Sequence, residues 1–348
     1  MKNWKKMVCV FIALIMLMTT TACAGAEDID TKRVMEYSVK EYSFPEKEVD
    51  VDDFCFTEVI GGTEMAVELS EKDVTRMEKI NRGLFDFIVK KYDLDWEYKS
   101  VKVLILDFSK VAGGEYAYYG AMADPDCGVI YLNKFVLHTS QDVVYRAVHE
   151  FIHCMVYNNY GTMNFAIFDE NGNYNGYYVS EAITDLITVD FLESEGEKDA
   201  LDYFLNGSNY CYTMVSLQIM EHSIPDMKKM FLNLEAEKFC QEITKLGEMH
   251  IEDGEIVDYG MVFIHQADVY QAYSTALLFA TTIEEYTMCL NKIQSSMYGN
   301  FEIACAVSDG LSAKDEEKVL QYMEHLFEIE GAGEMMEERI EYFRECMK

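Results

Sequence analysis

The sequence predicts an α+β protein in which a small mixed sheet and its helices are followed by a mainly helical half. Half of the 348 residues are hydrophobic and only three are prolines, which is typical of a chain that builds a large core. Short strand-like segments cluster at 101–133, between two segments with helix signals. Beyond Ser180 the pattern is mostly helical to the C-terminus.

A helix opens the sheet region. Ser70 followed by Asp73 is a capping-box signature, and apolar residues at helical spacing extend the predicted helix to about Tyr92. Three strand-like segments follow: VKVLILDF at 101–108, EYAYYGAM at 115–122 and GVIYLN at 128–133. The last of them is preceded by turn residues at 124–126.

A second capping box, Thr139 with Asp142, predicts a helix through about Tyr157. The segment FAIFDENGNYNGYYV that follows is typical of a hairpin bent at Gly172 or Gly176. The helical remainder is interrupted by breaks near Gly196, Pro225, Gly254 and Gly310.

The chain divides into four predicted parts. Residues 1–26 are a targeting signal, and 27–69 are an acidic spacer or a strand-bearing leader. Residues 70–195 form a first domain around the sheet, and 196–348 form a mainly helical domain that completes a cleft with it.

The targeting signal has a basic start, an apolar run at 7–18 and then small residues. The run is too short to span a bilayer. The small residues before Cys23 are similar to a bacterial lipoprotein cleavage site, which would place a lipid on Cys23 and the protein on the extracellular face of the cell membrane. Cleavage after Ala24 or Ala26, giving a secreted protein, is the alternative.

The charge balance limits the partners. Asp and Glu number 62 against 29 Lys and Arg, a net charge of −33. Such a chain has no counter-charge for phosphates, so nucleic-acid binding is excluded, and anionic headgroups repel it. We expect contact with a membrane only through the lipid on Cys23.

Ten cysteines are present, and eight remain once the signal and Cys23 are set aside. No pair has the CxxC spacing of a cysteine zinc site. Disulfides and buried free thiols are the two alternatives for these eight cysteines.

Residues 149–153 read HEFIH, an HExxH motif on the second predicted helix. Four residues make slightly more than one turn, so His149 and His153 lie on one face and can reach a single zinc ion. Glu150 is placed to take a proton from a metal-bound water. An apolar stripe on the opposite face would pack against the sheet: Val144, Val148, Phe151, Ile152 and Met155.

A catalytic zinc ion takes three protein ligands and leaves one position for water. Metzincins supply the third ligand as a histidine six residues after the second one, with a glycine at three. This chain has Val156 and Asn159 there, so that class is excluded.

The segment SEAITDL supplies a carboxylate instead, and with it the sequence resembles the gluzincins, the thermolysin-like zinc peptidases with a Glu-x-x-x-Asp helix. The resemblance implies a zincin-like catalytic domain and one Zn²⁺ per chain. It implies that His149, His153 and Glu181 bind the metal, that Glu150 is the general base, and that Asp185 orients His149 through its second ring nitrogen.

The interval between His153 and Glu181 is longer than gluzincins usually have, and we expect the hairpin at 164–178 to supply the excess. If Glu181 is an exposed carboxylate, Asp185 or Glu193 is the alternative ligand. The resemblance also implies an edge strand just before the active-site helix, where a peptide substrate pairs, and we assign GVIYLN at 128–133 to it.

Two further matches point to the aminopeptidase-like branch of gluzincins. GAMAD at 120–124 partly matches its GAMEN motif, but Ala123 replaces the glutamate that recognises a substrate amino terminus, which argues against aminopeptidase activity. VYQAYSTALLF at 269–279 is similar to the helix with the oxyanion-binding tyrosine, so Tyr270 takes that role, with Tyr273 as the alternative. His222 and His265 are other candidates for this donor.

These expectations describe an exported zinc metallopeptidase that acts on a peptide or protein substrate. The alternative is a non-catalytic surface-binding lipoprotein on a zincin scaffold. A zincin that hydrolyses a non-peptide amide would use the same five residues.

Overall fold

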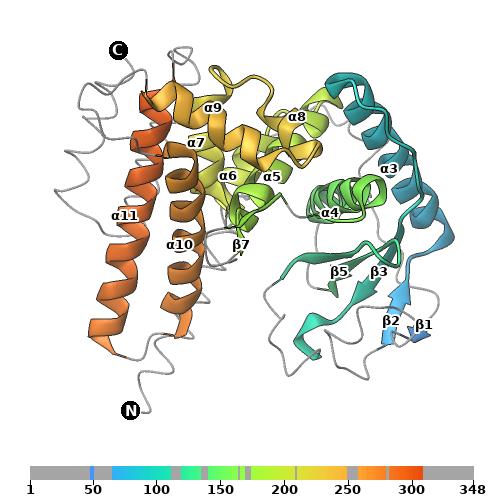
Figure 1. Cartoon of the computed structure of the whole chain (residues 1–348). Helices are drawn as coiled ribbons and strands as arrows, with labels where there is room; N and C mark the ends of the chain where they lie inside the picture. The colour runs from blue at the N-terminus through green and yellow to red at the C-terminus, as the bar shows by residue number, and fades with distance from the viewer. Residues whose placement is uncertain are drawn as a thin grey trace.

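The protein is described by a computed structural model, which covers residues 48–50, 65–110, 119–134, 140–163, 165–168, 174–207, 210–248, 258–279 and 282–308. Within these residues the chain is α+β: a small mixed sheet with two covering helices lies beside a larger set of helices (Figure 1). The targeting signal at 1–26 and Cys23 lie outside the described residues.

The sheet has five strands in the order β1-β2-β3-β5-β4. They are β1 (Glu48–Asp50), β2 (Met65–Glu68), β3 (Lys102–Leu106), β4 (Ala121–Asp124) and β5 (Val129–Asn133). β3 and β5 are parallel, and the other neighbours are antiparallel. β1 and β2 come from the segment at 27–69, for which a strand-bearing leader was one of the two expectations.

The prediction that the strand at 128–133 lies at the edge of the sheet is wrong. β5, the strand at 128–133, lies between β3 and β4, and β4 is at the edge. The physical reason is visible in β5, because all five of its residues are buried, which suits a central strand with both neighbours in place. β4 also begins later than the predicted strand at 115–122, of which 115–118 lie outside the described residues.

Two helices accompany the sheet. α3 (Glu71–Tyr92) begins as predicted, with the Ser70 side chain accepting a hydrogen bond from the Asp73 N–H at 3.3 Å. α4 (Ser140–Tyr160) carries the HExxH motif and packs on β4 and β5. The apolar stripe of α4 is fully buried, as predicted.

The centre of the molecule is α5 (Tyr177–Ser194), which is buried from Tyr178 to Leu192 except at Asp190 and contacts α3, α4, α6, α7, α8 and α10. A helix that is hydrophobic all round is a core helix. The predicted hairpin before it is present as β6 (Ile167–Phe168) paired antiparallel with β7 (Tyr174–Asn175).

The remaining helices are α6 (Ala200–Gly207), α7 (Cys211–Glu221), α8 (Met227–Leu232), α9 (Ala236–Glu248), α10 (Tyr259–Phe279) and α11 (Ile283–Val307). α10 and α11 lie side by side as a long pair (Figure 1). The breaks at Gly196 and Pro225 fall between helices as predicted. No helix in the described ranges has the length and apolar character needed to cross a bilayer.

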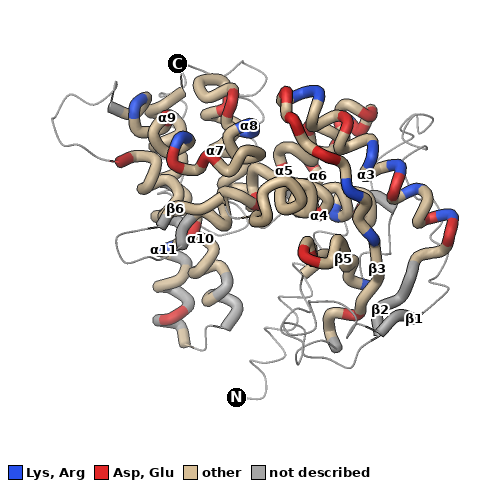
Figure 2. The backbone as a smooth tube through the Cα atoms, turned by 45° about the vertical axis from the view of Figure 1, so that its right-hand side comes forward, with Lys and Arg blue, Asp and Glu red and all other residues tan. Residues whose placement is uncertain are grey.

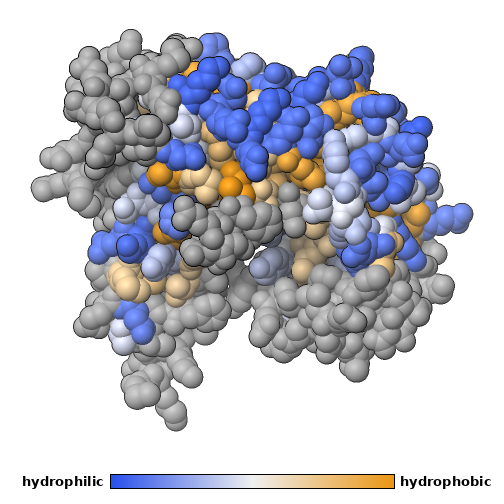
Figure 3. Space-filling view, in the orientation of Figure 1, coloured by the Kyte–Doolittle hydropathy of each residue, from blue (hydrophilic) through white to orange (hydrophobic). Residues whose placement is uncertain are grey.

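One hydrophobic core includes residues from both sides of the predicted boundary at 195. On the face shown in Figure 3, hydrophilic residues gather over α8, α9 and α3, and hydrophobic residues lie in the middle. Among the described residues, Cys154, Cys240 and Cys289 are buried free thiols.

Candidate metal centre

The two histidines of the motif lie together on one face of α4. Their ring centroids are 4.9 Å apart and the two Nε2 atoms are 3.1 Å apart. Both side chains are buried, and so is Glu150 between them in sequence. The spacing of four residues therefore produces the local geometry that the sequence predicted.

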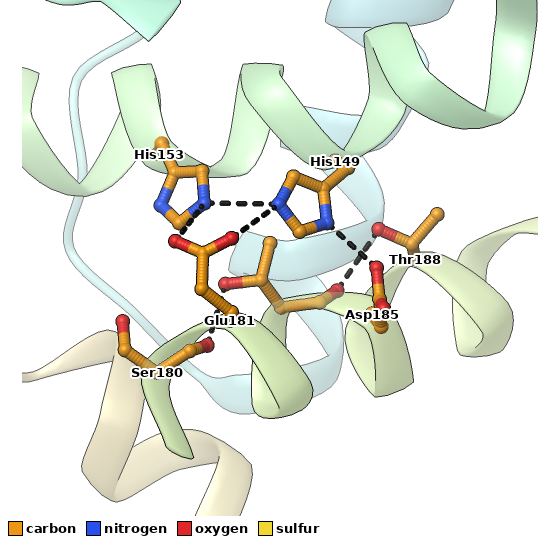
Figure 4. Close-up of polar contacts among 7 residues, drawn as sticks. His149, His153, Ser180, Glu181, Asp185 and Thr188 are labelled. Atoms are coloured by element: carbon orange, nitrogen blue, oxygen red, sulfur yellow. Dashed lines mark hydrogen bonds and ion pairs between the residues drawn. The ribbon is translucent and has the colours of Figure 1, made fainter. Parts of the chain in front are cut away.

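Glu181 comes to the histidines from α5, one helix away (Figure 4). Its Oε2 is 3.0 Å from Nε2 of His149, and its Oε1 is 3.3 Å from Nε2 of His153. One ligand atom from each residue lies within 4.8 Å of the other two. The exposed alternative ligand, Glu193, is not part of this group.

Asp185 orients His149 from the next turn of α5. Its Oδ1 accepts a hydrogen bond from Nδ1 of His149 at 2.7 Å, so the Nε2 lone pair faces His153 and Glu181. Asp185 therefore fills the outer position that the gluzincin resemblance implied, and does not replace Glu181. The buried hydroxyl groups of Thr184 and Thr188 bond to carbonyls within α5 (Figure 4).

The three residues fit a small, tetrahedrally coordinated cation. Ligand atoms at about 2.0 Å from a zinc ion are separated by about 3.3 Å along the edges of a tetrahedron. The two Nε2 atoms are 3.1 Å apart, close to this edge length, and the two carboxylate oxygens of Glu181 lie 3.0 Å from one imidazole and 3.3 Å from the other. Two imidazoles and a carboxylate are also the donor set of catalytic zinc sites. The buried group of His149, His153 and Glu181 could thus hold a metal ion.

The charges at the centre are strongly coupled. Burial lowers the pKa of His149, but the carboxylates of Asp185 and Glu181 outweigh it and hold the pKa well above its usual value. Burial would raise the pKa of Glu181, yet His153 and His149 hold it far below its usual range. Burial raises the pKa of Glu150, against the lowering effect of the two histidines.

The charge of Glu181 acts on Tyr177 and Tyr210, two tyrosines that sequence reasoning did not single out. The charge of Glu181, followed by burial and by Glu150, raises the pKa of Tyr177, and Tyr210 is hydrogen-bonded to Tyr177. The ring of Tyr210 stacks on that of His149 with centroids 6.4 Å apart. Tyr177 precedes Glu181 by four residues on one helix, a spacing that could have revealed it.

Tyr270 is farther from His149 in a cluster of contacting aromatic rings formed by Tyr178, Tyr210, Tyr212 and Tyr270. Its ring contacts those of Tyr178 and Tyr212, at centroid distances of 5.6 and 4.9 Å. Tyr178 in turn contacts Tyr210, so two rings stand between Tyr270 and His149. Of the other candidates for the oxyanion donor, Tyr273 is half-buried, and His222 and His265 are exposed.

The N-terminus of α5 is held by the helical half. The carboxylate of Asp268, on α10, accepts hydrogen bonds from the N–H groups of Gly176 and Tyr178 at 2.9 and 3.4 Å. Gly176 has φ = 117°, and a Cβ there would lie 2.6 Å from the Phe165 carbonyl oxygen, so glycine is required. α10 thereby positions the helix that carries Glu181.

Comparison with known protein families, curated proteins and solved structures finds no match for this chain.

Proposed function

We propose that the chain is a zinc-dependent metallopeptidase of the gluzincin type, with a zincin-like catalytic domain, that hydrolyses peptide bonds. The observation that carries the proposal is the convergence of His149, His153 and Glu181 in one buried group, with Glu150 beside them. A purely structural metal site would have no need of a buried carboxylate next to its first ligand.

His149, His153 and Glu181 would hold a zinc ion, which when bound would supply a Lewis acid for the scissile carbonyl and for the attacking water. Glu150 accepts a proton from the attacking water and delivers it to the leaving amine. Asp185 keeps His149 in the tautomer whose Nε2 lone pair faces the centre.

The oxyanion that forms on the substrate needs a hydrogen-bond donor. Tyr210 stacks on His149 and is hydrogen-bonded to Tyr177, whereas two rings stand between Tyr270 and His149, so we assign the donor to the pair Tyr177 and Tyr210, ahead of Tyr270. One such donor contributes about 3 kcal/mol to transition-state stabilisation.

We also propose that the protein is exported, with a lipid on Cys23 that tethers it to the outer face of the cell membrane. The secreted form remains the alternative. The support is the sequence at 1–26.

Glu150→Gln tests the mechanism. The variant should bind about one zinc per chain, like the parent, because Glu150 is not a ligand, and should lose peptide hydrolysis because no base remains. Metal analysis after dialysis and cleavage of a peptide library, with and without a chelator, measure both properties. Undiminished hydrolysis by Glu150→Gln would refute the mechanism. Zinc binding without cleavage by the parent would favour the surface-binding lipoprotein.

A further inference from the structure

The arginine on the motif helix is not used by the proposed mechanism. Arg146 lies one turn before Glu150 and is the only lysine or arginine in α4. Residues four apart on a helix are surface neighbours, so the guanidinium and the Glu150 carboxylate stand on the same side of α4. In Figure 2 the charged residues of both signs alternate along α3, whereas the visible part of α4 is mostly uncharged.

The guanidinium of Arg146 has unused binding capacity. Its Nε is buried and has no hydrogen-bond partner. The charge of Arg146 acts on two neighbours: it opposes the effect of burial, which raises the pKa of Glu150 and that of Tyr203. A buried donor without a partner is costly, and native structures keep one where a ligand supplies the acceptor.

The guanidinium lies where a substrate would pass. A Cβ built at Gly120 would overlap it, so the guanidinium occupies the space beside the residue that precedes β4. β4 is the edge strand of the sheet, and no strand of the described residues pairs with its outer side. A peptide that adds to this edge runs past Gly120 and therefore past Arg146.

We infer that Arg146 binds a carboxylate of the peptide substrate and so makes the site prefer substrates with an acidic group next to the scissile bond. The inference rests on the proposed peptidase function. Guanidinium is the cation that pairs best with a carboxylate, through two parallel hydrogen bonds. In a chain of net charge −33 the one cation of α4 is the local feature that attracts an acidic group.

A peptide offers this carboxylate from two sources, an acidic side chain or its free C-terminus. Peptides that the zinc-loaded chain cleaves are resynthesised in matched pairs. One arm compares Glu with Gln beside the scissile bond, and the other compares a C-terminal acid with a C-terminal amide. In the arm that contains the recognised group, kcat/KM should favour the acid by about 10- to 100-fold, the range expected for a hydrogen bond to a charged group.

Arg146→Gln should reduce the ratio of kcat/KM between the acid and amide peptides to about one. Arg146→Lys should keep part of the ratio, because lysine has the positive charge but not the two parallel N–H donors of guanidinium. The matched control is Arg82→Gln, an exposed arginine on α3, which should keep the parent ratio. If Arg146 is only a packing residue, Arg146→Gln will slow both members of each pair equally and leave the ratio unchanged, and the inference is then wrong.

A binding measurement separates this inference from the proposed function. Fluorescence anisotropy with zinc-loaded Glu150→Gln protein uses labelled short peptides of fixed sequence, one pair with a C-terminal acid or amide and one pair with Glu or Gln at a central position, and gives their affinities without any need for cleavage. Preference for the acid that disappears when Arg146→Gln is added supports the inference even if no peptide is hydrolysed. Equal affinity for both members of every pair overturns it, and loss of zinc-dependent cleavage alone overturns only the peptidase proposal.

Discussion

At the scale of single residues, the bond between Asp185 and His149 decides how well the centre holds a cation. The bond is buried and 2.7 Å long, and it selects the tautomer of His149. In the Asp185→Asn variant the asparagine side chain can still lie beside Nδ1 of His149, but it lacks the negative charge that makes the imidazole a better ligand. We expect zinc affinity to fall about 10- to 100-fold, as measured by competition with a chromophoric chelator.

The matched control for this prediction is Glu193→Gln, an exposed carboxylate two turns later on the same helix. It should leave zinc affinity unchanged. A larger loss in Glu193→Gln than in Asp185→Asn would mean that the alternative ligand is the real one.

The assignment of the oxyanion donor is also a residue-scale prediction. Tyr177→Phe removes a hydroxyl on which the charge of Glu181 acts, and should lower kcat about 100-fold while zinc content stays the same, because only the transition state uses the proposed hydrogen bond. Tyr270→Phe, whose ring packs on Tyr178 and Tyr212, should lower kcat less. Steady-state kinetics of the two variants on one peptide decide between them, and the reverse order would reinstate Tyr270.

At the scale of elements, the helices that form the site could be predicted because their signals are local. The pair His149 and His153, and the pair Glu181 and Asp185, each depend on a spacing of four residues within one helix. Helix geometry alone then places each pair on one face. The convergence of α4 and α5 was supplied by the gluzincin resemblance and not by any spacing in the sequence.

The edge of the sheet could not be predicted in the same way. Strand-like composition at 128–133 indicated a strand but not its neighbours, since β5 pairs with β3 and β4 from different parts of the chain. The contact of Asp268 with the N-terminus of α5 could not be predicted for the same reason, because 92 residues separate Asp268 from Gly176. Tyr210 also comes from outside α4 and α5, so no local pattern links it to His149.

At the scale of the whole molecule, a partly buried ionic network connects α3, α5, α7 and α8. One carboxylate oxygen of Asp190 accepts hydrogen bonds from Lys91 at 2.7 Å, Tyr92 at 2.9 Å and Lys228 at 2.9 Å. Lys228 is buried and also pairs with Glu221 at 2.6 Å. The network joins a helix of the sheet region to the helical half through the far end of α5, the helix that carries Glu181.

This network predicts a dependence of stability on pH. Burial would raise the pKa of Asp190, but Lys228 and Lys91 hold it below its ordinary value. A carboxyl whose pKa is lower in the folded than in the unfolded chain stabilises the fold above its unfolded pKa. That contribution is lost as the pH falls below about 4, through the folded pKa. Lys228 has the opposite sign: its pKa is raised, so its contribution is complete at neutral pH and is lost only in strongly alkaline solution.

Asp190→Asn should therefore lower the free energy of unfolding by about 3 kcal/mol at pH 7, because Lys228 stays buried with only Glu221 as its charged partner. The difference from the parent should stay constant from pH 7 to about pH 5 and shrink below about pH 4, where the parent loses the same charge. Urea titrations of the metal-free proteins measure it, with Asp86→Asn, which breaks an exposed pair on α3, as the control that should change little. A difference in the free energy of unfolding that persists undiminished at pH 3 would show that Asp190 acts through packing. The claim that its ion pairs stabilise the fold would then be wrong.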